Sequence, residues 1–312
     1  MRSPVFSFLE TDDLSPKEIE GLFAQAKTIK NDFLKHRSFS KASFSSQPLL
    51  LSLLFFEPST RTRSSFEMAA LRMGWQTTFF DGASKEGSSL IKGETFEDTF
   101  WTLHAMGPNV LVVRCGDELK LLELSKKTQI PLINAGYGTH SHPTQALLDV
   151  FTMLETFADL KNKNILFVGD VRHSRVAQSH FRFLSSLGAN IGVVGPESFL
   201  GGIPASQKSF TKLSEALPWA DVVVGLRVQF ERHDENNTFS RDEYIKSYQL
   251  DSTKAKHLKS TALVFHPGPV NWGLEFDPSV RELPHFRMWQ QKQNGVYVRA
   301  ALLDLVARKN GY

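Results

Sequence analysis

Hydroxyl and guanidinium side chains alternate in one short segment, Ser59-Thr60-Arg61-Thr62-Arg63. The apolar run before it, Leu49–Phe56, predicts a buried strand. Apolar residues then recur at spacings of three and four from Phe66 to Met73, which predicts a helix. The first turn of a helix carries unpaired N–H groups and the positive end of the helix dipole. Together with the hydroxyls and arginines they predict a phosphate-binding site; the alternative is a capped helix with surface arginines.

A histidine stands at the start of a second predicted helix, in His142-Pro143-Thr144-Gln145. Proline is favoured at the first position of a helix. An apolar strand at Leu132–Asn134 and a glycine-rich turn at Gly136–Gly138 precede the histidine, so we expect its imidazole to point outward. An imidazole in that position can donate a hydrogen bond to a carbonyl oxygen. The alternative is an ordinary helix start in which Gln145 serves as a cap.

Further cationic residues follow other predicted strands. Arg175 comes after the turn Gly169-Asp170, where a single glycine excludes a dinucleotide-binding fingerprint. Arg227 and Gln229 are two residues apart, so an extended backbone would place a guanidinium and an amide on one side, a pair suited to a carboxylate. Each of them could also be an ordinary exposed side chain. The same two interpretations apply to Arg114, at the end of a predicted strand, and to Lys92, in a loop rich in serine and glycine.

The composition excludes several classes of protein. The formal charge of +3 and the lack of a basic run argue against a nucleic-acid partner. One cysteine, Cys115, excludes an internal disulfide and favours a reducing, cytoplasmic setting. No apolar stretch approaches the roughly 20 residues that span a membrane, and the first residues lack an apolar signal core. The histidines show no metal-ligand spacing, so we expect no metal ion.

Short apolar runs alternate with helical patterns along the chain, which predicts parallel sheets flanked by helices, an α/β fold. The length of 312 residues is enough for two domains. The expected strands are Leu49–Phe56, Thr77–Phe80, Val110–Val113, Leu132–Asn134, Asn164–Val168, Asn190–Val194, Asp221–Gly225 and Ala262–Phe265.

These motifs occur in the order found in the aspartate/ornithine carbamoyltransferase family, which the chain resembles over nearly its whole length. The resemblance depends on Ser59–Arg63, Ser88-Ser89-Leu90-Ile91-Lys92-Gly93-Glu94, His142–Gln145, Gly169-Asp170 with Arg175, Arg227-Val228-Gln229 and His266-Pro267-Gly268-Pro269. It implies a carbamoyl-phosphate domain at 1–142, on which a C-terminal helix at 293–312 packs, and an aspartate domain at 143–292. It also implies two interdomain helices, near 143–156 and 295–309.

The resemblance implies transfer of the carbamoyl group of carbamoyl phosphate to the amine of L-aspartate, an early step of pyrimidine biosynthesis, without a cofactor. The residues it assigns to carbamoyl phosphate are Ser59, Thr60, Arg61, Thr62, Ser88, Arg114, His142, Gln145, Gly268 and Pro269. Those it assigns to catalysis are Arg61, Thr62, Lys92, Arg114 and His142. Those it assigns to aspartate are Lys92, Arg175, Arg227 and Gln229, while Glu57 and Arg232 would act in domain closure.

The family also implies a homotrimer in which the loop of Ser88 and Lys92 reaches a neighbour's site, with a regulatory chain or a dihydroorotase as possible partners. Two alternatives remain: an ornithine-type enzyme, and a non-catalytic structural or regulatory paralogue. The ornithine branch typically has His-Cys-Leu-Pro where this chain has His266-Pro267-Gly268-Pro269. Two residues depart from the family pattern. This chain has Tyr137 where many relatives have Asp, and Trp272 where many have Arg.

Overall fold

The computed structural model describes residues 5–41, 44, 49–84, 92–201, 203–204, 207–229 and 239–312. Ser88 and Arg232, both predicted to act in the site, lie outside these ranges. The chain divides into two compact units: unit 1 comprises Met1–Leu148 with Gln293–Tyr312, and unit 2 comprises Asp149–Lys292. The division falls within α5 (Pro143–Leu154) and within α9 (Met288–Lys309), so each of these helices contributes residues to both units.

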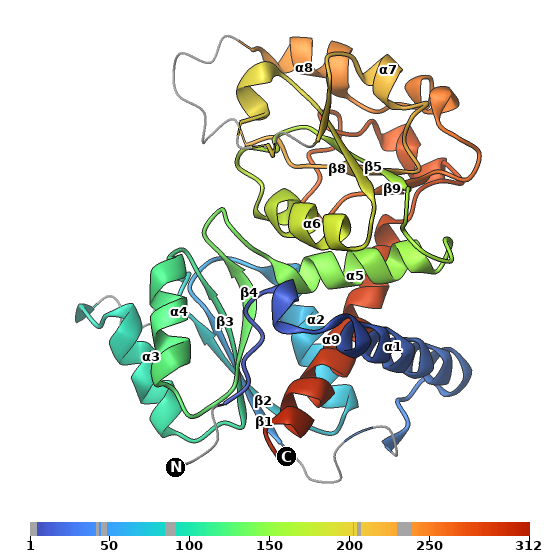
Figure 1. Ribbon diagram of the computed structural model, residues 1–312. Coiled ribbons are helices and arrows are strands. Elements are labelled where there is room, and N and C mark those ends of the chain that lie inside the picture. The colour runs from blue at the N-terminus through green and yellow to red at the C-terminus, as the bar shows by residue number, and fades with distance from the viewer. Residues whose placement is uncertain are drawn as a thin grey trace. The chain divides into compact units, whose positions relative to one another are not determined.

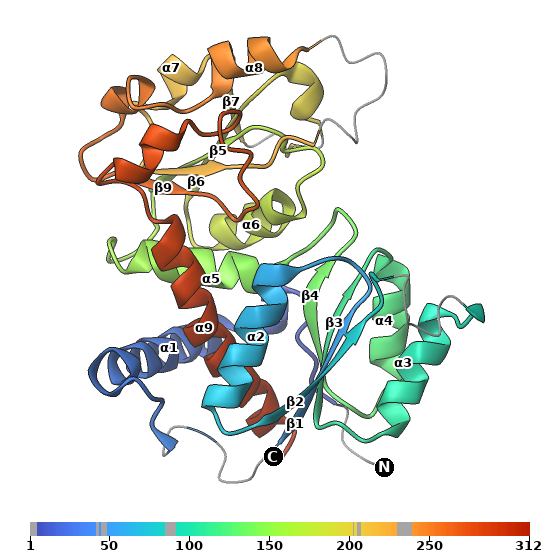
Figure 2. The ribbon, with the colours of Figure 1, turned by 180° about the vertical axis from the view of Figure 1, so that it is seen from behind.

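Unit 1 contains a parallel sheet in the order β2-β1-β3-β4. Its strands are β1 (Leu50–Phe55), β2 (Gln76–Asp81), β3 (Val110–Cys115) and β4 (Leu132–Tyr137). Its helical elements besides parts of α5 and α9 are η1 (Thr11–Asp13), α1 (Pro16–His36), α2 (Thr60–Arg72), α3 (Phe96–Ala105) and α4 (Glu118–Lys127). Helices α3 and α4 cover one face of the sheet, and α1, α2 and α9 lie on the other side (Figures 1 and 2).

Unit 2 contains a second parallel sheet, in the order β7-β6-β5-β8-β9. Its strands are β5 (Asn164–Val168), β6 (Asn190–Val194), β7 (Lys208–Phe210), β8 (Val222–Gly225) and β9 (Leu263–Phe265). Its helical elements besides parts of α5 and α9 are α6 (Arg175–Ser186), η4 (Glu197–Phe199), α7 (Leu213–Ala216), α8 (Arg241–Tyr248), η6 (Lys254–His257) and η7 (Pro278–Glu282). Helix α6 lies on one face of this sheet, and α7 and α8 lie on the other (Figures 1 and 2).

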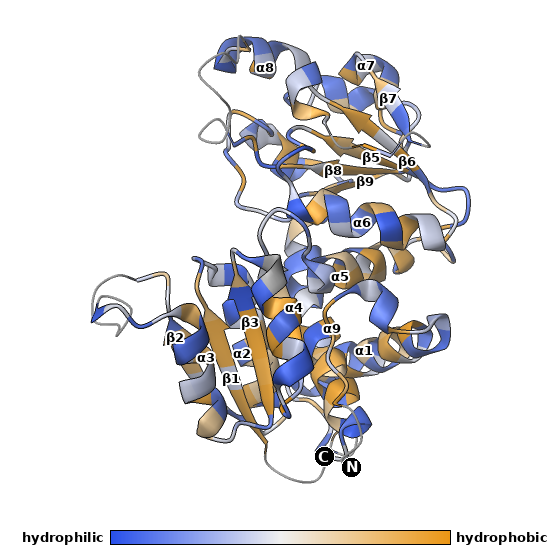
Figure 3. Cartoon of the chain, turned by 60° about the vertical axis from the view of Figure 1, so that its left-hand side comes forward, coloured by the Kyte–Doolittle hydropathy of each residue, from blue (hydrophilic) through white to orange (hydrophobic). Residues whose placement is uncertain are grey.

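The central strands of both sheets are almost wholly apolar, as Figure 3 shows for β1, β3 and β5. Strands buried on both faces carry such continuous apolar runs in parallel sheets covered by helices. In each sheet the chain order reverses between two neighbouring strands, β1 and β3 in unit 1 and β5 and β8 in unit 2. Ligands of open α/β sheets bind beyond the carboxyl ends of the strands at such a reversal. The residues after these four strands are therefore the first candidates for a site.

The predicted fold class is confirmed, with differences in particular elements. Strand β4 continues to Tyr137, so the predicted turn at Gly136–Gly138 was wrong: the turn lies at 138–140. Strand β7 was missed, because its three residues include only one apolar side chain, that of Phe210. In the helix predicted near 295–309, Val298, Ala301 and Leu302 are fully buried, as their spacing indicated. No helix in the described ranges is long and apolar enough to cross a membrane.

Candidate active site

The first group of predicted site residues lies at the N-terminus of α2, directly after β1. Ser59 is the N-cap residue with an extended backbone, yet its side chain makes no capping hydrogen bond within the described residues. The fully described first turn of α2 contains no acidic residue. The interpretation as an ordinary capped helix is therefore not supported here. The backbone N–H groups of this turn and the positive end of the dipole are available to an anion.

The two arginines of this motif have different surroundings. The guanidinium of Arg63 lies 3.6 Å from the centre of the Phe79 ring, and its Nε is 3.7 Å from Glu67. Arg61 is exposed near the start of the helix, next to the buried Thr62. Because Arg63 is held by the sheet and by its own helix, Arg61 is the better candidate for a phosphate ligand.

His142 and Thr62 are in contact, although they are far apart in the sequence. The Thr62 hydroxyl lies 3.1 Å from His142 Nε2, and both residues are 5% exposed. His142 directly precedes α5, and its carbonyl oxygen accepts a hydrogen bond from the Gln145 N–H (2.9 Å). The structure thus brings a hydroxyl from the start of α2 to an imidazole at the start of α5. This pair suits a carbonyl oxygen that gains negative charge, because both groups can donate to it.

The loop before His142 is fixed by residues that the sequence did not indicate. The N–H of Tyr137 donates to the carbonyl oxygen of Ser141 at 3.0 Å. The hydroxyls of Tyr137 and Ser141 both donate to the Glu10 carboxylate, the latter over 2.7 Å. Tyr137, one of the two departures from the family pattern, therefore connects the end of β4 to the N-terminal segment.

Arg114 lies near the carboxyl end of β3, as predicted, and is paired within unit 1. Its Nε is 3.3 Å from a carboxylate oxygen of Glu57, and its Nη1 donates to the carbonyl oxygen of Ala135 at 3.4 Å. Glu57, which was predicted to act in domain closure, thus contacts Arg114 in the structure. Lys92 is exposed, in a short turn before α3.

In unit 2, the Gln229 side chain contacts the turn that leads into α6, where Arg175 lies. Arg175 is the first residue of the helix, whose N-cap Ser174 accepts from the N–H of Ala177 at 3.2 Å. The side-chain amide of Gln229 donates to the carbonyl oxygen of His173 at 3.1 Å. The segment after β8 is therefore connected to the turn after β5, as the reversal in strand order predicts.

The turn after β5 needs glycine at position 169. Gly169 has a φ of +115°, and a Cβ there would lie 2.9 Å from both the Leu226 carbonyl oxygen and the Tyr244 hydroxyl. The next residue, Asp170, is fully buried and is 3.0 Å from Nδ1 of His173. Asp170 therefore holds the turn that leads into α6.

The segment 226–229 alternates between buried and partly exposed residues. Leu226 and Val228 are each 1% exposed, whereas Arg227 and Gln229 are partly exposed. This alternation fits an extended backbone, in which the guanidinium and the amide lie on the side away from the core. Their residue types then make this side suitable for a carboxylate.

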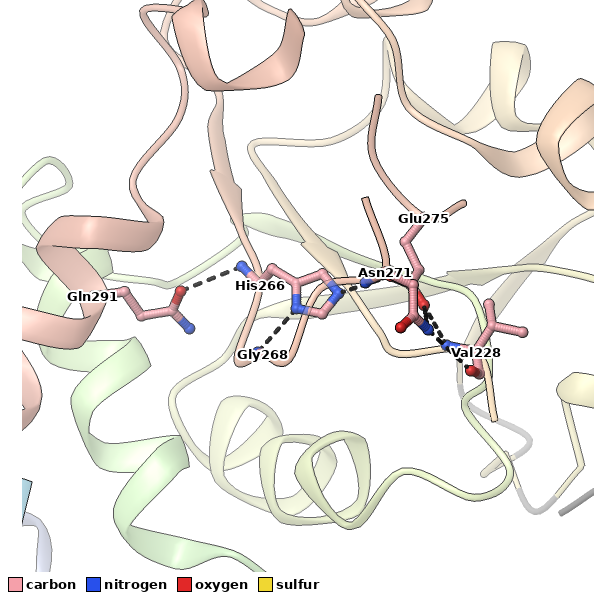
Figure 4. A network of polar contacts seen from close by, with 6 residues as sticks. All are labelled: Val228, His266, Gly268, Asn271, Glu275 and Gln291. Carbon is pink, nitrogen blue, oxygen red and sulfur yellow. Dashed lines mark hydrogen bonds and ion pairs between the residues drawn. The ribbon is translucent and has the colours of Figure 1, made fainter. Parts of the chain in front are cut away.

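A polar network connects this segment with the loop after β9 (Figure 4). Glu275, which is 2% exposed, accepts hydrogen bonds from the N–H of Val228 at 2.8 Å and of Asn271 at 2.5 Å. His266, fully buried, accepts from the N–H of Gly268 at 2.9 Å. Burial raises the pKa of Glu275 to about 7, while the hydrogen bonds and the charge of Arg227 lower it.

Sequence reasoning missed Glu275 and Asn271 altogether. The available signal was an acid flanked by two apolar residues in Leu274-Glu275-Phe276, a pattern that favours a buried carboxylate with hydrogen-bond partners. Gly268 and Pro269, predicted to offer their carbonyl groups, are joined by a cis peptide bond. Trp272, the second departure, packs into the core of unit 2, with Arg281 3.9 Å from its ring centre. Within the described residues no three His, Cys, Asp or Glu side chains form a possible metal site.

These features define a two-domain α/β protein with cationic residues at the strand-order reversal of each sheet. The family described as aspartate/ornithine carbamoyltransferase, carbamoyl-P binding domain, matches residues 7–155. Its counterpart, the Asp/Orn binding domain, matches residues 161–306. The chain therefore belongs to the aspartate/ornithine carbamoyltransferase family, which confirms the resemblance seen in the sequence.

Individual relatives match over almost the full length. The aspartate carbamoyltransferase catalytic subunit of Listeria monocytogenes serotype 4b is 37% identical over 303 residues, covering 97% of this chain and 96% of that protein. The corresponding subunit of Opitutus terrae is 39% identical over 305 residues, covering 96% and 94%. The catalytic subunit of M. jannaschii aspartate transcarbamoylase, a solved structure, has a TM-score of 0.82 at 27% identity and covers 99% of this chain and 100% of that one.

Proposed function

We propose that this chain is an aspartate carbamoyltransferase, which transfers the carbamoyl group of carbamoyl phosphate to L-aspartate and yields N-carbamoyl-L-aspartate and phosphate. The relatives above carry this name, and Trypanosoma cruzi aspartate transcarbamoylase has been solved with carbamoyl aspartate and phosphate. The observation that carries the proposal is the Thr62–His142 pair beside the N-terminus of α2, since it offers donors to a carbonyl next to a seat for phosphate. The product would enter pyrimidine biosynthesis.

In the proposed reaction, unit 1 holds the phosphate group and the carbonyl oxygen of the donor substrate. The phosphate group lies at the start of α2, where Ser59, Thr60 and Arg61 surround it, and Arg114 reaches from phosphate to carbonyl. Thr62 and His142 donate to the carbonyl oxygen as it becomes negative, and Gln145 with the carbonyls of Gly268 and Pro269 binds the carbamoyl amide. The neutral amine of aspartate attacks the carbonyl carbon, the bond from that carbon to the phosphate oxygen breaks, and the departing phosphate takes the amine proton. Catalysis then depends on positioning and on electrostatic stabilisation.

Unit 2 selects the acceptor substrate by charge. Arg175, Arg227 and Gln229, with Lys92, would bind the two carboxylates of aspartate. Ornithine would instead need a carboxylate for its distal amine. The buried carboxylates near these residues, Asp170 and Glu275, already accept hydrogen bonds from the protein. The positive charge of Arg175, Arg227 and Lys92 therefore favours a dicarboxylic acceptor.

The active assembly that we propose is a cytoplasmic homotrimer. Ser88 and Lys92 of one subunit would complete the site of the next, and Glu57 would exchange Arg114 for Arg175 and Arg232 when both substrates are bound. A regulatory chain or a dihydroorotase could bind this trimer. The mass of the native assembly tests this part: a trimer supports it, and a monomer that is fully active would refute the shared site.

The reaction is tested by following phosphate release from carbamoyl phosphate with either aspartate or ornithine. Release with aspartate alone is expected; release with ornithine alone would overturn the acceptor, and release with neither would favour a non-catalytic paralogue. Arg61→Gln should lower the rate by roughly 10²–10³, the usual effect of removing one stabilising donor. Arg63→Gln is the matched control, because Arg63 is held by Phe79 and Glu67. Equal losses in both variants would refute the assignment of Arg61.

A further inference from the structure

Glu275 is surrounded by backbone and side-chain N–H groups (Figure 4). Its Oε1 accepts from Val228 N and from Asn271 Nδ2, each at 2.8 Å, and its Oε2 accepts from Asn271 N at 2.5 Å. Its own N–H and C=O are also bonded, to the carbonyl of Asn271 and the N–H of Leu250. Hydrogen bonds to an ionised acceptor are about twice as strong as neutral ones. The side chain is therefore fixed, and these hydrogen bonds favour its carboxylate form.

The donors to Glu275 come from two segments that hold proposed ligand-binding groups. Val228 lies between Arg227 and Gln229 in the segment after β8, and Asn271 follows Gly268 and Pro269 in the segment after β9. Strands β8 and β9 pair in parallel, so the sheet fixes where both segments start. Neither segment continues as a strand. Beyond the sheet edge, Glu275 accepts hydrogen bonds from both segments.

His266 determines which protonation state fits this network. Its Nδ1 accepts from the Gly268 N–H at 2.9 Å, so in the neutral ring the proton is assigned to Nε2, which lies 3.9 Å from Glu275 Oε2. A proton on that oxygen would face the imidazole N–H. The opposite tautomer would remove this conflict, but its Nδ1–H would then oppose the N–H of Gly268. The contacts therefore fit an ionised Glu275 beside a neutral His266.

From these contacts we propose that Glu275 is a positioning residue for the amino-acid substrate: its carboxylate sets the spacing between segment 227–229 and segment 266–271. This inference rests on the proposed function, because it assigns Arg227 and Gln229 to the carboxylates of the acceptor. Glu275 is buried and acts through the Val228 amide, not by contact with the substrate. When it loses its charge, both segments lose their common acceptor.

The charged and titratable groups that face Glu275 come from three elements. They are Arg227 after β8, His266 after β9 and Tyr244 on α8; burial raises the pKa of this tyrosine, and the charges of Glu275 and Asp170 raise it further. Burial raises the pKa of Glu275 to about 7. The hydrogen bonds and the charge of Arg227 lower this pKa, and the effect of the hydrogen bonds is the larger of the two. A bound dicarboxylate offsets only the charge of Arg227, which is the smallest of the effects that lower the pKa of Glu275. The hydrogen bonds are the larger effect, so they decide that ligand binding favours the ionised form of Glu275. Dicarboxylate affinity should therefore increase as pH rises through 7.

The test measures binding of succinate, a dicarboxylate without the reactive amine, to the full chain saturated with carbamoyl phosphate. Titration calorimetry is done from pH 6 to 8.5 on the unmodified protein, on Glu275→Gln and on Glu282→Gln, a control with the same charge change at an exposed position. Glu275→Gln should bind succinate about 10- to 100-fold more weakly at pH 8, as expected for a buried donor left unpaired. Its affinity should not vary with pH near 7, and Glu282→Gln should match the unmodified protein.

Other readouts separate positioning from a merely structural role. The dissociation constant of inorganic phosphate should stay within about twofold in Glu275→Gln, because the proposed phosphate ligands Ser59, Thr60 and Arg61 belong to unit 1. A lower melting temperature with unchanged succinate affinity and an unchanged pH profile would overturn the proposal. If Glu275→Gln does not fold, the unmodified protein still decides: it should release part of a proton on binding succinate near pH 7, and uptake or no exchange would refute the inference. Absence of phosphate release by the unmodified protein would instead refute the proposed function.

Discussion

Replacing Arg299 by lysine is expected to destabilise unit 1 and to slow the reaction. Arg299 lies on α9 and is 3% exposed. Its Nη1 donates to the Ser65 hydroxyl at 2.8 Å, and its Nη2 donates to the Thr144 hydroxyl at 3.1 Å. The Ser65 hydroxyl in turn donates to the carbonyl oxygen of Thr62 at 2.9 Å. The guanidinium therefore connects the two helix starts that hold the Thr62–His142 pair.

The size of the effect follows from the geometry of the two cations. Lysine keeps the charge, but its ammonium is a point donor and cannot reproduce the fork that reaches Ser65 and Thr144 together. A lost hydrogen bond to a charged group costs about 1.5–3 kcal/mol, so we expect a loss of about 2 kcal/mol in the free energy of unfolding. A looser Thr62–His142 pair could lower kcat by up to about 10²-fold, the cost of misplacing groups by about 1 Å.

The assay is urea denaturation followed by circular dichroism, together with phosphate release under saturating substrates. Arg308→Lys on the same helix is the control, because the side chain of Arg308 is 56% exposed although it pairs with Asp304 at 2.8 Å. Its replacement keeps a single positive charge beside the buried Asp304 carboxylate at an exposed position, so it should lower stability less than Arg299→Lys does. If Arg299→Lys unfolds at the same urea concentration as the unmodified protein and keeps its kcat, the proposed connection is wrong.

Three further predictions concern single residues. His142→Ala should lower kcat by roughly 10²–10³ with a smaller change in carbamoyl phosphate affinity, measured by phosphate release and calorimetry; an equal loss in both would contradict a role in the transition state. Gly192→Ala should cost about 1–3 kcal/mol in urea denaturation, because a Cβ there would lie 2.5 Å from the Trp219 ring, whereas Gly21→Ala, with nothing within 4 Å, should not destabilise. Burial raises the pKa of Glu275 from 4.5 to about 7, so the stability that its protonated form provides is present below pH 4.5 and is lost as pH rises through 7. The loss amounts to about 3 kcal/mol at 1.36 kcal/mol per pH unit, and a pH series of melting curves that runs parallel for Glu275→Gln and the unmodified protein would contradict it.

Much of the fold follows from local patterns. Continuous apolar runs predicted the central strands β1, β3 and β5, because strands covered on both faces need such residues throughout. Strand β4 was predicted too short, since Gly136 signals a turn in isolation although here the strand continues through it. Strand β7 lies at the edge of its sheet and has too few apolar residues to be recognised. The local signal thus fails where the ladder of a neighbouring strand, not the residue types, decides the structure.

The candidate site was predictable where a polar or charged residue lies next to the end of a strand. Ser59, Arg114 and Arg227 each follow or end a central strand, so their neighbours in sequence already indicate their place in the sheet. Arg299 and Glu275 gave no such signal. Their partners are far along the chain, 234 residues from Arg299 to Ser65 and 47 residues from Glu275 to Val228. A single sequence does not show such pairs, because apolar neighbours such as those of Glu275 can indicate that a charge is buried but not which distant residues it contacts.

These two buried charges have complementary roles, which follow from the groups they support. Near α2 and α5 the groups to be held are the hydroxyls of Ser65 and Thr144, which can accept, so the supporting residue is a donor, Arg299. Beyond β8 and β9 the groups are backbone N–H donors, so the supporting residue is an acceptor, Glu275. A buried charge is costly, and an apolar residue of similar size is often at least as stable. Substitution of either residue by a well-packed apolar side chain should therefore reduce activity more than stability wherever its main role is to position the site.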